Sequence, residues 1–326
     1  MKKKVALFYG GDSSEFEVSV NSAMHLLEHF DDSKYDVYRV IIKGSDWRVI
    51  TIDNKEAKID KSDFSFLEAQ QDGLTFNRVK FDKVLIMIHG TPGENGLLQA
   101  YFEMVGVDFI SCSSTVSAIT FDKYACKCFL RDTKISLAKE IFLRKGDEYN
   151  CIDIVEKLGL PLFVKPNNGG SSFGITKVKE VSQLEDAIQL AFTQDSSILI
   201  EEFIEGREMT NGVFQIGDKL TSLPVTEIVS HNEFFDYNAK YLGESNEICP
   251  AQIADELRDR IKATSQKIYK YLGCRGVVRI DYIVKNQEIY FLEINTIPGM
   301  TKMSLVPQQL REAGYTIKDF LTMLLG

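Results

Sequence analysis

Residues 277–304 read VVRIDYIVKNQEIYFLEINTIPGMTKMS, and this stretch predicts the core of the fold. Two runs of alternating apolar and polar residues, 277–284 and 288–294, flank the turn-forming residues 285–287. Alternation on both sides of a short polar turn is the pattern of a β-hairpin. We therefore expect two antiparallel strands here.

One face of this hairpin carries polar side chains. Residues two apart in a strand share a face, so Arg279 lies beside Asp281, and Glu293 lies beside Asn295. The short turn brings Asp281 within a residue or two of the position opposite Glu293. Carboxylates on a sheet face that should be buried are costly unless a cation compensates them. Oxygen ligands without nearby Cys or His suit Mg²⁺, so we favour a magnesium site over a solvated face with a surface ion pair.

The composition is that of a globular protein with two or three domains. The chain has 326 residues and is 44% hydrophobic, which provides enough apolar side chains for sizeable cores. The net charge is −9, which argues against nucleic acid or an anionic membrane as the main partner. An anionic ligand must therefore meet local lysines.

Nothing in the sequence predicts export. The apolar run after the N-terminal lysines is too short for a signal peptide and ends in glycine, and no stretch has the length of a membrane span. The six cysteines lack paired metal-ligand spacings. We expect a cytoplasmic protein with reduced thiols.

The first third of the chain predicts a doubly wound α/β unit, because short apolar runs alternate with residues at helical spacing. Ligands of such units bind beyond the carboxyl ends of the strands, where residues 13–17 and the pair His89-Gly90 lie. The predicted elements are strands at 5–9, 37–42 and 84–88, a helix around 20–27 and a helix at 97–105.

From about residue 121 the pattern predicts strands of mixed pairing with helices between them. Residues 167–174 form a loop rich in glycine and serine, which can wrap a phosphate with backbone N–H groups or can be a plain turn between strands. The neighbouring Lys165 and Lys123 favour a nucleotide. The predicted elements are strands at 161–166, 174–178 and 198–203 and a helix at 182–192.

A third region begins beyond residue 206. Residues 230–245 have no clear period and are rich in aromatic residues, which is typical of a functional lid. A helix at 253–272 follows, and Gly273 is its stop signal.

Eight motifs resemble, in order, those of the D-alanine–D-alanine ligases of the ATP-grasp superfamily. The resemblance covers about residues 5–310. It implies a doubly wound α/β domain at 1–120, which binds the first D-alanine and forms a dimer contact, followed by a two-lobed ATP-grasp fold with a central lobe at 121–206 and a C-terminal lobe at 207–326. The motifs are Gly10-Gly11 with Glu15–Ser19, His89-Gly90, Asp122-Lys123, Val164-Lys165-Pro166, Gly170-Ser171-Ser172, Asp236–Tyr241, Arg279-Ile280-Asp281 and Glu293–Thr296.

The family resemblance implies ATP-driven joining of two D-alanines through an acyl phosphate, for peptidoglycan precursor synthesis. ATP is the co-substrate, two Mg²⁺ or Mn²⁺ ions are the implied cofactors, and activation by a monovalent cation stays open. A homodimer is implied, with no nucleic acid or membrane partner.

The family's site residues carry over by position. Asp281, Glu293 and Asn295 resemble the metal ligands. Lys123, Lys165 and Lys240 resemble the phosphate-binding lysines, and the resemblance places Glu201, Glu202, Phe203, Ile204, Glu208, Phe234 and Leu292 around the adenosine. The resemblance implies that Glu17, held by Ser171 and Tyr241, binds the first D-alanine, with His89 nearby. It implies that Arg279 stabilises the oxyanion. It also implies that the carboxylate of the second D-alanine binds to Ser304 and the Leu305 amide, near Gly299.

Three departures from the family pattern stand out. Asn95 replaces the usual Asp, residues 111–114 replace a more glycine-rich turn, and Lys302-Met303 lie beside the second subsite. Two alternatives therefore remain: a ligase that uses D-lactate or D-serine as its second substrate, and a non-catalytic nucleotide- or amino-acid-binding regulator on the same scaffold. The histidines His25 and His29 lack a third metal ligand and are expected at the surface.

Overall fold

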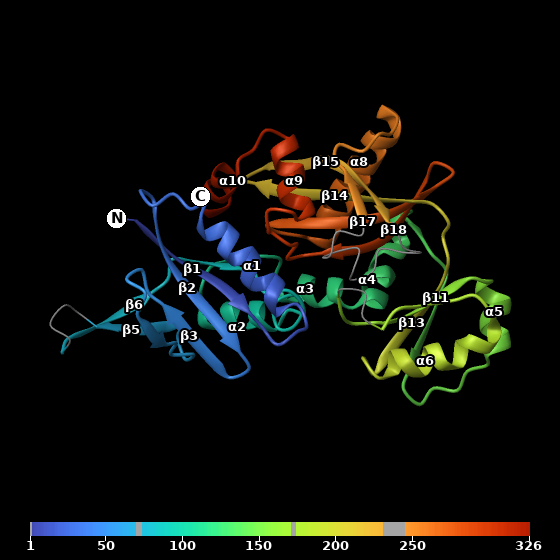
Figure 1. Cartoon of the computed structure of the whole chain (residues 1–326), viewed down its shortest axis with the longest axis horizontal. Helices are drawn as coiled ribbons and strands as arrows, with labels where there is room; N and C mark the ends of the chain where they lie inside the picture. Colours follow the sequence, from blue (N-terminus) through green and yellow to red (C-terminus); the bar gives the residue numbers. More distant parts are fainter. Residues whose placement is uncertain (1, 70–73, 171–173, 231–244) are drawn as a thin grey trace.

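The computed structural model describes residues 2–69, 74–170, 174–230 and 245–326. Its framework consists of a six-stranded, a four-stranded and a second six-stranded sheet, together with a two-stranded hairpin of β5 (Ser65–Ala69) and β6 (Phe76–Lys80). The two six-stranded sheets lie close together, and the four-stranded sheet lies to one side of them (Figure 1).

The first sheet has a parallel centre. β1 lies between β2 and β7, all parallel, because an apolar run such as that of β1 is buried on both faces and suits the middle of a parallel sheet. The predicted strands and helices of this α/β unit are confirmed. The strand order is β4 (Glu56–Lys58), β3 (Asp46–Ile50), β2 (Tyr35–Lys43), β1 (Lys3–Gly10), β7 (Lys83–Ile86), β8 (Phe109–Ile110), and the helices are α1 (Phe16–Leu27) and α2 (Leu97–Val105).

Two short helices lead from the first sheet to the second. α3 (Ser114–Phe121) and α4 (Lys123–Leu130) are separated only by Asp122, whose side chain accepts a hydrogen bond from the Ala125 amide and so caps α4. A single 3₁₀ turn, Arg131–Thr133, follows α4.

The second sheet is antiparallel throughout, so the predicted mixed pairing is wrong for this sheet. Two helices cover it and supply its separate core, while the predicted strands and the predicted helix at 182–192 are confirmed. The order is β10 (Glu140–Arg144), β13 (Ser197–Glu202), β11 (Leu162–Pro166), β12 (Thr176–Val178), and the helices are α5 (Cys151–Leu158) and α6 (Leu184–Phe192), the latter preceded by a 3₁₀ turn at Val181–Gln183.

The third sheet contains the hairpin from which the sequence analysis began. Its order is β16 (Ser245–Ile248), β15 (Lys219–Ser230), β14 (Arg207–Ile216), β17 (Val277–Lys285), β18 (Glu288–Asn295), β9 (Ser136–Leu137), with only the β18–β9 pair parallel. Helix α8 (Asp255–Leu272) packs on it and ends at Gly273, which has the left-handed φ of 72° typical of a C-cap. This prediction is confirmed.

The hairpin has the predicted register. Asn286 and Gln287 both have positive φ, 50° and 69°, as the tightest two-residue hairpin turns require. Asp281 lies directly opposite Glu293, and Arg279 lies opposite Asn295. A bulge after Asp281 places the extra residue, Leu292, on β18.

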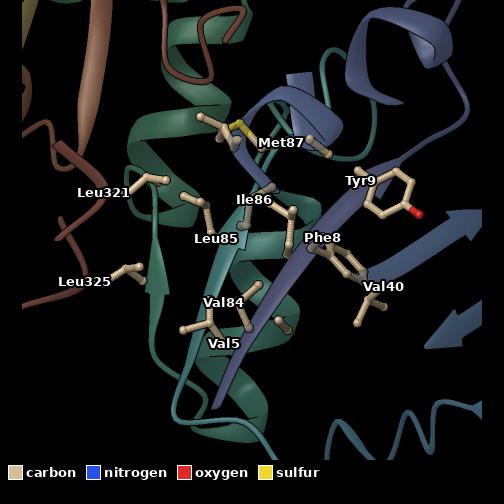
Figure 2. Close-up of a cluster of buried hydrophobic side chains, with 14 of the residues drawn as sticks. Val5, Phe8, Tyr9, Val40, Val84, Leu85, Ile86, Met87, Leu321 and Leu325 are labelled. Atoms are coloured by element: carbon tan, nitrogen blue, oxygen red, sulfur yellow. The ribbon is translucent and has the colours of Figure 1, made fainter. Parts of the chain in front are cut away.

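The C-terminal helices pack against the first sheet. α9 (Leu305–Glu312) and α10 (Ile317–Leu325) share one apolar core with β1 and β7. Figure 2 shows Leu321 and Leu325 of α10 in the same cluster as Val5 and Val84. Residues from the two ends of the chain thus stabilise one core. Among the described residues, no helix combines the length and apolar character that crossing a membrane would require.

Candidate active site

The Asp281 carboxylate is held by hydrogen bonds from three side chains. The Arg279 guanidinium donates through Nε to Oδ1 at 2.9 Å and through Nη2 to Oδ2 at 2.8 Å. Thr210, opposite on β14, donates to Oδ1 at 2.5 Å, and Asn295 donates to Oδ2 at 3.2 Å. The side chains of Arg279 and Asp281 are only 14% and 6% exposed, so this is an interior ion pair and not the solvated hairpin face considered as the alternative.

The same face offers donors for a divalent cation. Among the residues that the structure describes, no group of three or more His, Cys, Asp or Glu side chains is close enough to hold a metal ion. The Asp281 and Glu293 carboxylates are directly opposite each other, and Asn295 adds an amide oxygen. Two carboxylates and an amide, with no nitrogen or sulfur ligand, fit Mg²⁺ that takes its remaining ligands from phosphates and water.

Glu15, between β1 and α1, is a buried acidic residue near the glycine-rich loop. It is 8% exposed. A methyl group added to Gly170 would lie 2.8 Å from Glu15 Oε2, and one added to Gly90 would lie 3.4 Å from the same oxygen. The carboxylate therefore lies against the glycine-rich loop of the second sheet, and Gly170 leaves room for it.

The structure places Glu15, and not the predicted Glu17, against the glycine-rich loop. Helix α1 begins at Phe16, so each residue from there turns the chain by about 100°, and two residues move a side chain to the far side of the helix. Glu15, just before the first turn, points inward, whereas Glu17 is exposed.

His89 lies beside Glu15 and is buried. Its Nδ1 donates to the Ile297 carbonyl oxygen at 2.8 Å, which leaves Nε2 to accept from the Ser22 hydroxyl at 3.3 Å. Burial lowers the pKa of His89, so the imidazole is neutral and its proton is on Nδ1. This histidine ties the end of the first sheet to the loop after β18.

Glu94 makes a second tie between the same segments. Its Oε2 accepts from the Gly90 amide at 2.7 Å and its Oε1 accepts from the Ile297 amide at 3.4 Å. Burial and the nearby Glu15 carboxylate raise the pKa of Glu94 to about 8. Glu94 thus holds a proton over much of the neutral range, and sequence reasoning did not single it out.

The first residues of the glycine-rich loop, 167–169, are held by the N-terminus of α4. The Lys123 ammonium donates to the Gly169 carbonyl oxygen at 2.7 Å, and the Lys123 amide donates to the Asn167 carbonyl oxygen at 3.2 Å. The Tyr124 amide donates to Asn167 Oδ1 at 2.9 Å. Although no helix follows this loop, the start of α4 lies against its first residues and brings Lys123 to it.

Lys165 and Glu201, on neighbouring strands β11 and β13, form a buried ion pair. Burial works against a charged Glu201, but Lys165 and Lys127 together lower the pKa of its carboxyl group to about 2. Glu201 is therefore ionised at neutral pH. Lys127 was not predicted, because a lysine within a short amphipathic helix resembles a solvated residue.

The remaining adenosine candidates surround the end of β13. The Glu202 amide donates to the Lys139 carbonyl oxygen at 3.0 Å, and the ring of Phe203 lies 4.1 Å from the Lys177 ammonium. Ile204 is half-buried and follows directly. Two further half-buried candidates come from the third sheet, Glu208 near the start of β14 and Leu292 at the bulge of β18.

The candidate second subsite lies at the start of α9. Ser304 is the N-cap residue, and its Oγ accepts from the Thr301 amide at 3.0 Å. A methyl group on Gly299 would lie 2.9 Å from that oxygen, so the glycine leaves room for the serine side chain. Leu305 is buried in the first turn of α9.

Helix α1 anchors this subsite. The Met300 amide donates to Ser22 Oγ at 3.1 Å, and His25 Nδ1 donates to the Met300 carbonyl oxygen at 2.6 Å. His25 is thus not the plain surface residue expected from the sequence. These bonds connect the second subsite to the helix that follows Glu15.

Four predicted site residues lie outside the described residues: Ser171, Phe234, Lys240 and Tyr241. The printed contacts join the others in smaller groups: Arg279, Asp281 and Asn295 on the hairpin, Lys165 with Glu201 on the second sheet, and His89 with the loop after β18.

Comparisons with known proteins identify the family of the chain. Residues 4–112 match the family model described as D-ala D-ala ligase N-terminus, and residues 130–326 match D-ala D-ala ligase C-terminus. The chain is 46% identical over 323 residues to a D-alanine–D-alanine ligase of Phocaeicola vulgatus, a match that covers 99% of this chain and 98% of that protein. It is 47% identical to that of Parabacteroides distasonis, with 99% and 96% covered.

Solved structures share the whole fold. The VanG D-Ala:D-Ser ligase of Enterococcus faecalis has a TM-score of 0.88 at 34% identity, with 100% of this chain and 99% of that chain covered. The D-alanine–D-alanine ligase of Bacillus anthracis complexed with ATP has a TM-score of 0.79 at 28% identity, with 99% and 96% covered. The predicted fold class, an α/β domain followed by an ATP-grasp fold, is confirmed. With both family models matched and relatives of this identity spanning nearly its full length, the chain belongs to the D-alanine–D-alanine ligase family.

Proposed function

We propose that this protein joins two molecules of D-alanine into D-alanyl-D-alanine at the expense of ATP, for the synthesis of peptidoglycan precursors. Relatives that carry this name match nearly the full chain. The structural observation that carries the proposal is the contact between Glu15 and Gly170. It places an acidic side chain suited to an amino-acid ammonium directly beside a phosphate-type loop.

The reaction has two steps. A carboxylate oxygen of the first D-alanine attacks the γ-phosphorus of ATP and displaces ADP, which leaves an acyl phosphate. The amine of the second D-alanine then attacks the acyl carbon, and the tetrahedral oxyanion collapses, expels inorganic phosphate and loses the amine proton. The protein's task is to position the reactants and to stabilise negative charge.

We assign the nucleotide to the region between β13 and the glycine-rich loop. Lys123 and Lys165 bind phosphate oxygens, and Lys240 joins them by its resemblance to the family. A lysine ammonium is a compact charge on a flexible stem, which suits a phosphate that changes position during transfer. The assigned adenosine contacts are Glu201, Glu202, Phe203, Ile204, Glu208, Phe234 and Leu292.

Asp281, Glu293 and Asn295 have the donor set to hold Mg²⁺ or Mn²⁺. When bound, two such ions would neutralise negative charge on the phosphates. Arg279 and Thr210 orient the Asp281 carboxylate by hydrogen bonds, so its oxygens are in place before any ligand arrives.

Glu15 binds the ammonium of the first D-alanine, and Ser171 and Tyr241 support it by resemblance to the family. The neutral His89 donates its only N–H to the Ile297 carbonyl oxygen, so it positions the loop after β18 and does not carry a proton in the reaction.

Arg279 stabilises the oxyanion of the tetrahedral intermediate. The Asp281 carboxylate holds its guanidinium by a two-pronged pair, which fixes the plane of the guanidinium group. A preorganised, permanently charged donor of this kind lowers the barrier of the second step.

The second D-alanine binds at the start of α9. Its carboxylate accepts hydrogen bonds from the Ser304 hydroxyl and the Leu305 amide, near Gly299. A helix N-terminus presents unpaired amides, which favours an anion at this position.

We further propose that residues 1–120, 121–206 and 207–326 form three units, that the protein is a cytoplasmic homodimer contacting itself through the first unit, and that a monovalent cation can activate it. None of its six cysteines forms a disulfide in the structure.

A D-serine-using ligase is the second candidate. The observation that favours it is the TM-score of 0.88 to a protein named D-Ala:D-Ser ligase. Lys302 and the 74% exposed Met303 also lie beside the second subsite, where they differ from the family pattern.

Phosphate release tests the proposal. Purified protein is supplied with Mg²⁺, ATP and D-alanine, with D-serine or D-lactate added as the second substrate. D-alanine alone should support ATP turnover and yield the dipeptide. Turnover that requires D-lactate or D-serine would contradict the assignment, and nucleotide binding without any turnover would support the regulator alternative.

A further inference from the structure

Lys127 is a fully buried lysine whose function is not explained by the assignments above. It lies on α4 one turn after Lys123, and its side chain is only 2% exposed. Its ammonium donates to the Ala138 carbonyl oxygen at 3.0 Å, pairs with Glu140 Oε2 at 3.1 Å and forms a close pair with Glu201 Oε1. An ammonium is this deeply buried only where charged partners compensate it.

These contacts belong to a larger set of charges, which we name the lysine cluster. Glu201 binds Lys127 through Oε1 and Lys165 through Oε2. On the other side, Glu140 binds Lys127 through Oε2 and Arg131 through Oε1 at 2.5 Å. Three cations thus share two carboxylates, and the lysine cluster carries one surplus positive charge.

Lys165 is the member of the lysine cluster that can present the surplus positive charge to a ligand. Arg131 is 47% exposed, so solvent screens it, whereas Lys165 is 8% exposed and comes directly before the strand end that leads into the glycine-rich loop. Without Lys127, Glu201 would have Lys165 as its only cation in the lysine cluster. Moving that ammonium to a phosphate would then leave a buried carboxylate unpaired, which is costly.

We propose that Lys127 is a positioning residue for nucleotide binding: it neutralises Glu201 from the interior side, so that the Lys165 ammonium is free to bind a phosphate of ATP. Glu201 then stays ionised and fixed when Lys165 changes partner. This inference rests on the proposed function, because Lys165 is assigned there to the nucleotide.

The position of Lys127 supports this coupling. α4 carries Lys123 and Lys127 four residues apart, and Lys123 bonds the Gly169 carbonyl oxygen of the glycine-rich loop. One short helix therefore contacts the phosphate loop directly with its first lysine and acts on Lys165, through Glu201, with its second.

The test uses the whole protein and the variants K127M, K127R, E201Q and E201Q/K127M. The matched control is K139M. It removes an exposed lysine that pairs at 3.8 Å with Glu202, the neighbour of Glu201 on β13. The dissociation constant of MgATP is measured by calorimetry, and the KM values for ATP and D-alanine are measured by phosphate release.

K127M should weaken ATP binding about 10- to 100-fold, the range expected when a charge-assisted contact is lost, and should leave the KM of D-alanine within about twofold. K127R keeps the charge and should recover most of the affinity, and K139M should match the wild type. E201Q/K127M should bind ATP as E201Q does, because Lys127 acts through the Glu201 charge. If the double variant binds more than about fivefold more weakly than E201Q, Lys127 does not act through Glu201 and the proposal is wrong.

The pH dependence separates this role from a structural one. In K127M, Glu201 loses one of the two lysines that keep its pKa low, so its carboxyl group should be protonated at a higher pH than in the wild type, which releases Lys165 and reduces the ATP-binding defect as the pH falls. A defect that does not shrink down to the lowest pH at which K127M stays folded would contradict the proposal.

Two safeguards keep the outcomes distinct. If K127M does not fold, E201Q/K127M still tests the proposal, because binding of ATP more than about fivefold weaker than by E201Q overturns it; that pair differs by the same lysine without the opposing carboxylate charge. If wild-type protein neither binds ATP nor forms dipeptide, the proposed function fails. If it does both and K127M matches it, only the role of Lys127 is contradicted.

Discussion

Replacement of Arg279 by alanine tests the site most sharply, because the structure separates this residue from the nucleotide contacts. The R279A variant loses the two-pronged pair to Asp281, with distances of 2.9 and 2.8 Å, while Thr210 and Asn295 continue to hold that carboxylate. The metal ligand should therefore stay in place while the oxyanion loses its cationic donor.

The magnitude follows from the role of Arg279. Removal of one preorganised donor to an oxyanion costs about 2.7–4 kcal/mol of transition-state stabilisation, so kcat should fall about 10²- to 10³-fold. The dissociation constant of MgATP should change less than about threefold, because the assigned ATP contacts are intact. Breaking a buried pair should also lower the free energy of unfolding by about 3–5 kcal/mol, so thermal unfolding must accompany the kinetics.

The chain offers a matched control. Arg207 makes an equivalent two-pronged pair with Glu227 in the same sheet, with Nε and Nη2 distances of 2.7 and 2.6 Å. R207A should leave kcat within about twofold of wild type, since this arginine is 47% exposed and lies outside the assigned site. Phosphate release at saturating ATP and D-alanine measures kcat. If R279A turns over within about threefold of wild type, or loses ATP affinity as severely as kcat, its assigned role is refuted.

Two further predictions concern the first sheet. E15Q should lower kcat/KM for D-alanine about 10- to 100-fold by removing the partner of the substrate ammonium, whereas E17Q should stay near wild type; equal losses in steady-state kinetics would restore Glu17 as the candidate. In the folded protein Glu94 keeps its proton up to about pH 8, whereas the unfolded chain releases it near pH 4.5. The free energy of unfolding should therefore fall as the pH rises from about 4.5 to about 8, and should level off above that. In E94Q this decrease should be absent from thermal unfolding measured across the same range. E103Q is the control of opposite sign: Ser114 holds the pKa of Glu103 low, so the contribution of Glu103 to stability is lost only at acid pH. If E94Q keeps the same dependence of stability on pH as the wild type, the burial argument for Glu94 is contradicted.

The hairpin could be predicted because its evidence is local. Alternation, the short turn at 285–287 and the two-residue period of a strand predicted Asp281 within a residue or two of the position opposite Glu293, and the structure pairs the two directly. The strands around Lys165 and the helix ending at Gly273 were predicted on the same kind of local evidence.

The error at Glu17 has an equally local cause. In Glu15-Phe16-Glu17 the two carboxylates are equivalent until the first residue of the helix is known, and sequence patterns place helix ends only to within a few residues. The helix start determines which one faces Gly170, so burial was needed to choose Glu15.

Other features depend on contacts between distant segments. Lys127 meets a glutamate 74 residues away, and Glu94 meets the amide of Ile297, so no local pattern marks either as special. The long strands β14 and β15 were missed, since Pro224 and a shift in register interrupt their alternation. The packing of α10 on β1 joins the two ends of the chain, which only tertiary structure reveals.

The central claim is that this site joins D-alanine to D-alanine, and the most direct test is a competition. Wild-type protein is incubated with Mg²⁺, ATP and equal concentrations of D-alanine, D-serine and D-lactate at neutral pH, and the products are identified by mass spectrometry. The account predicts D-alanyl-D-alanine as the main product, formed in a one-to-one ratio with ADP. A main product containing D-serine or D-lactate, or ADP formed without any ligated product, would contradict it.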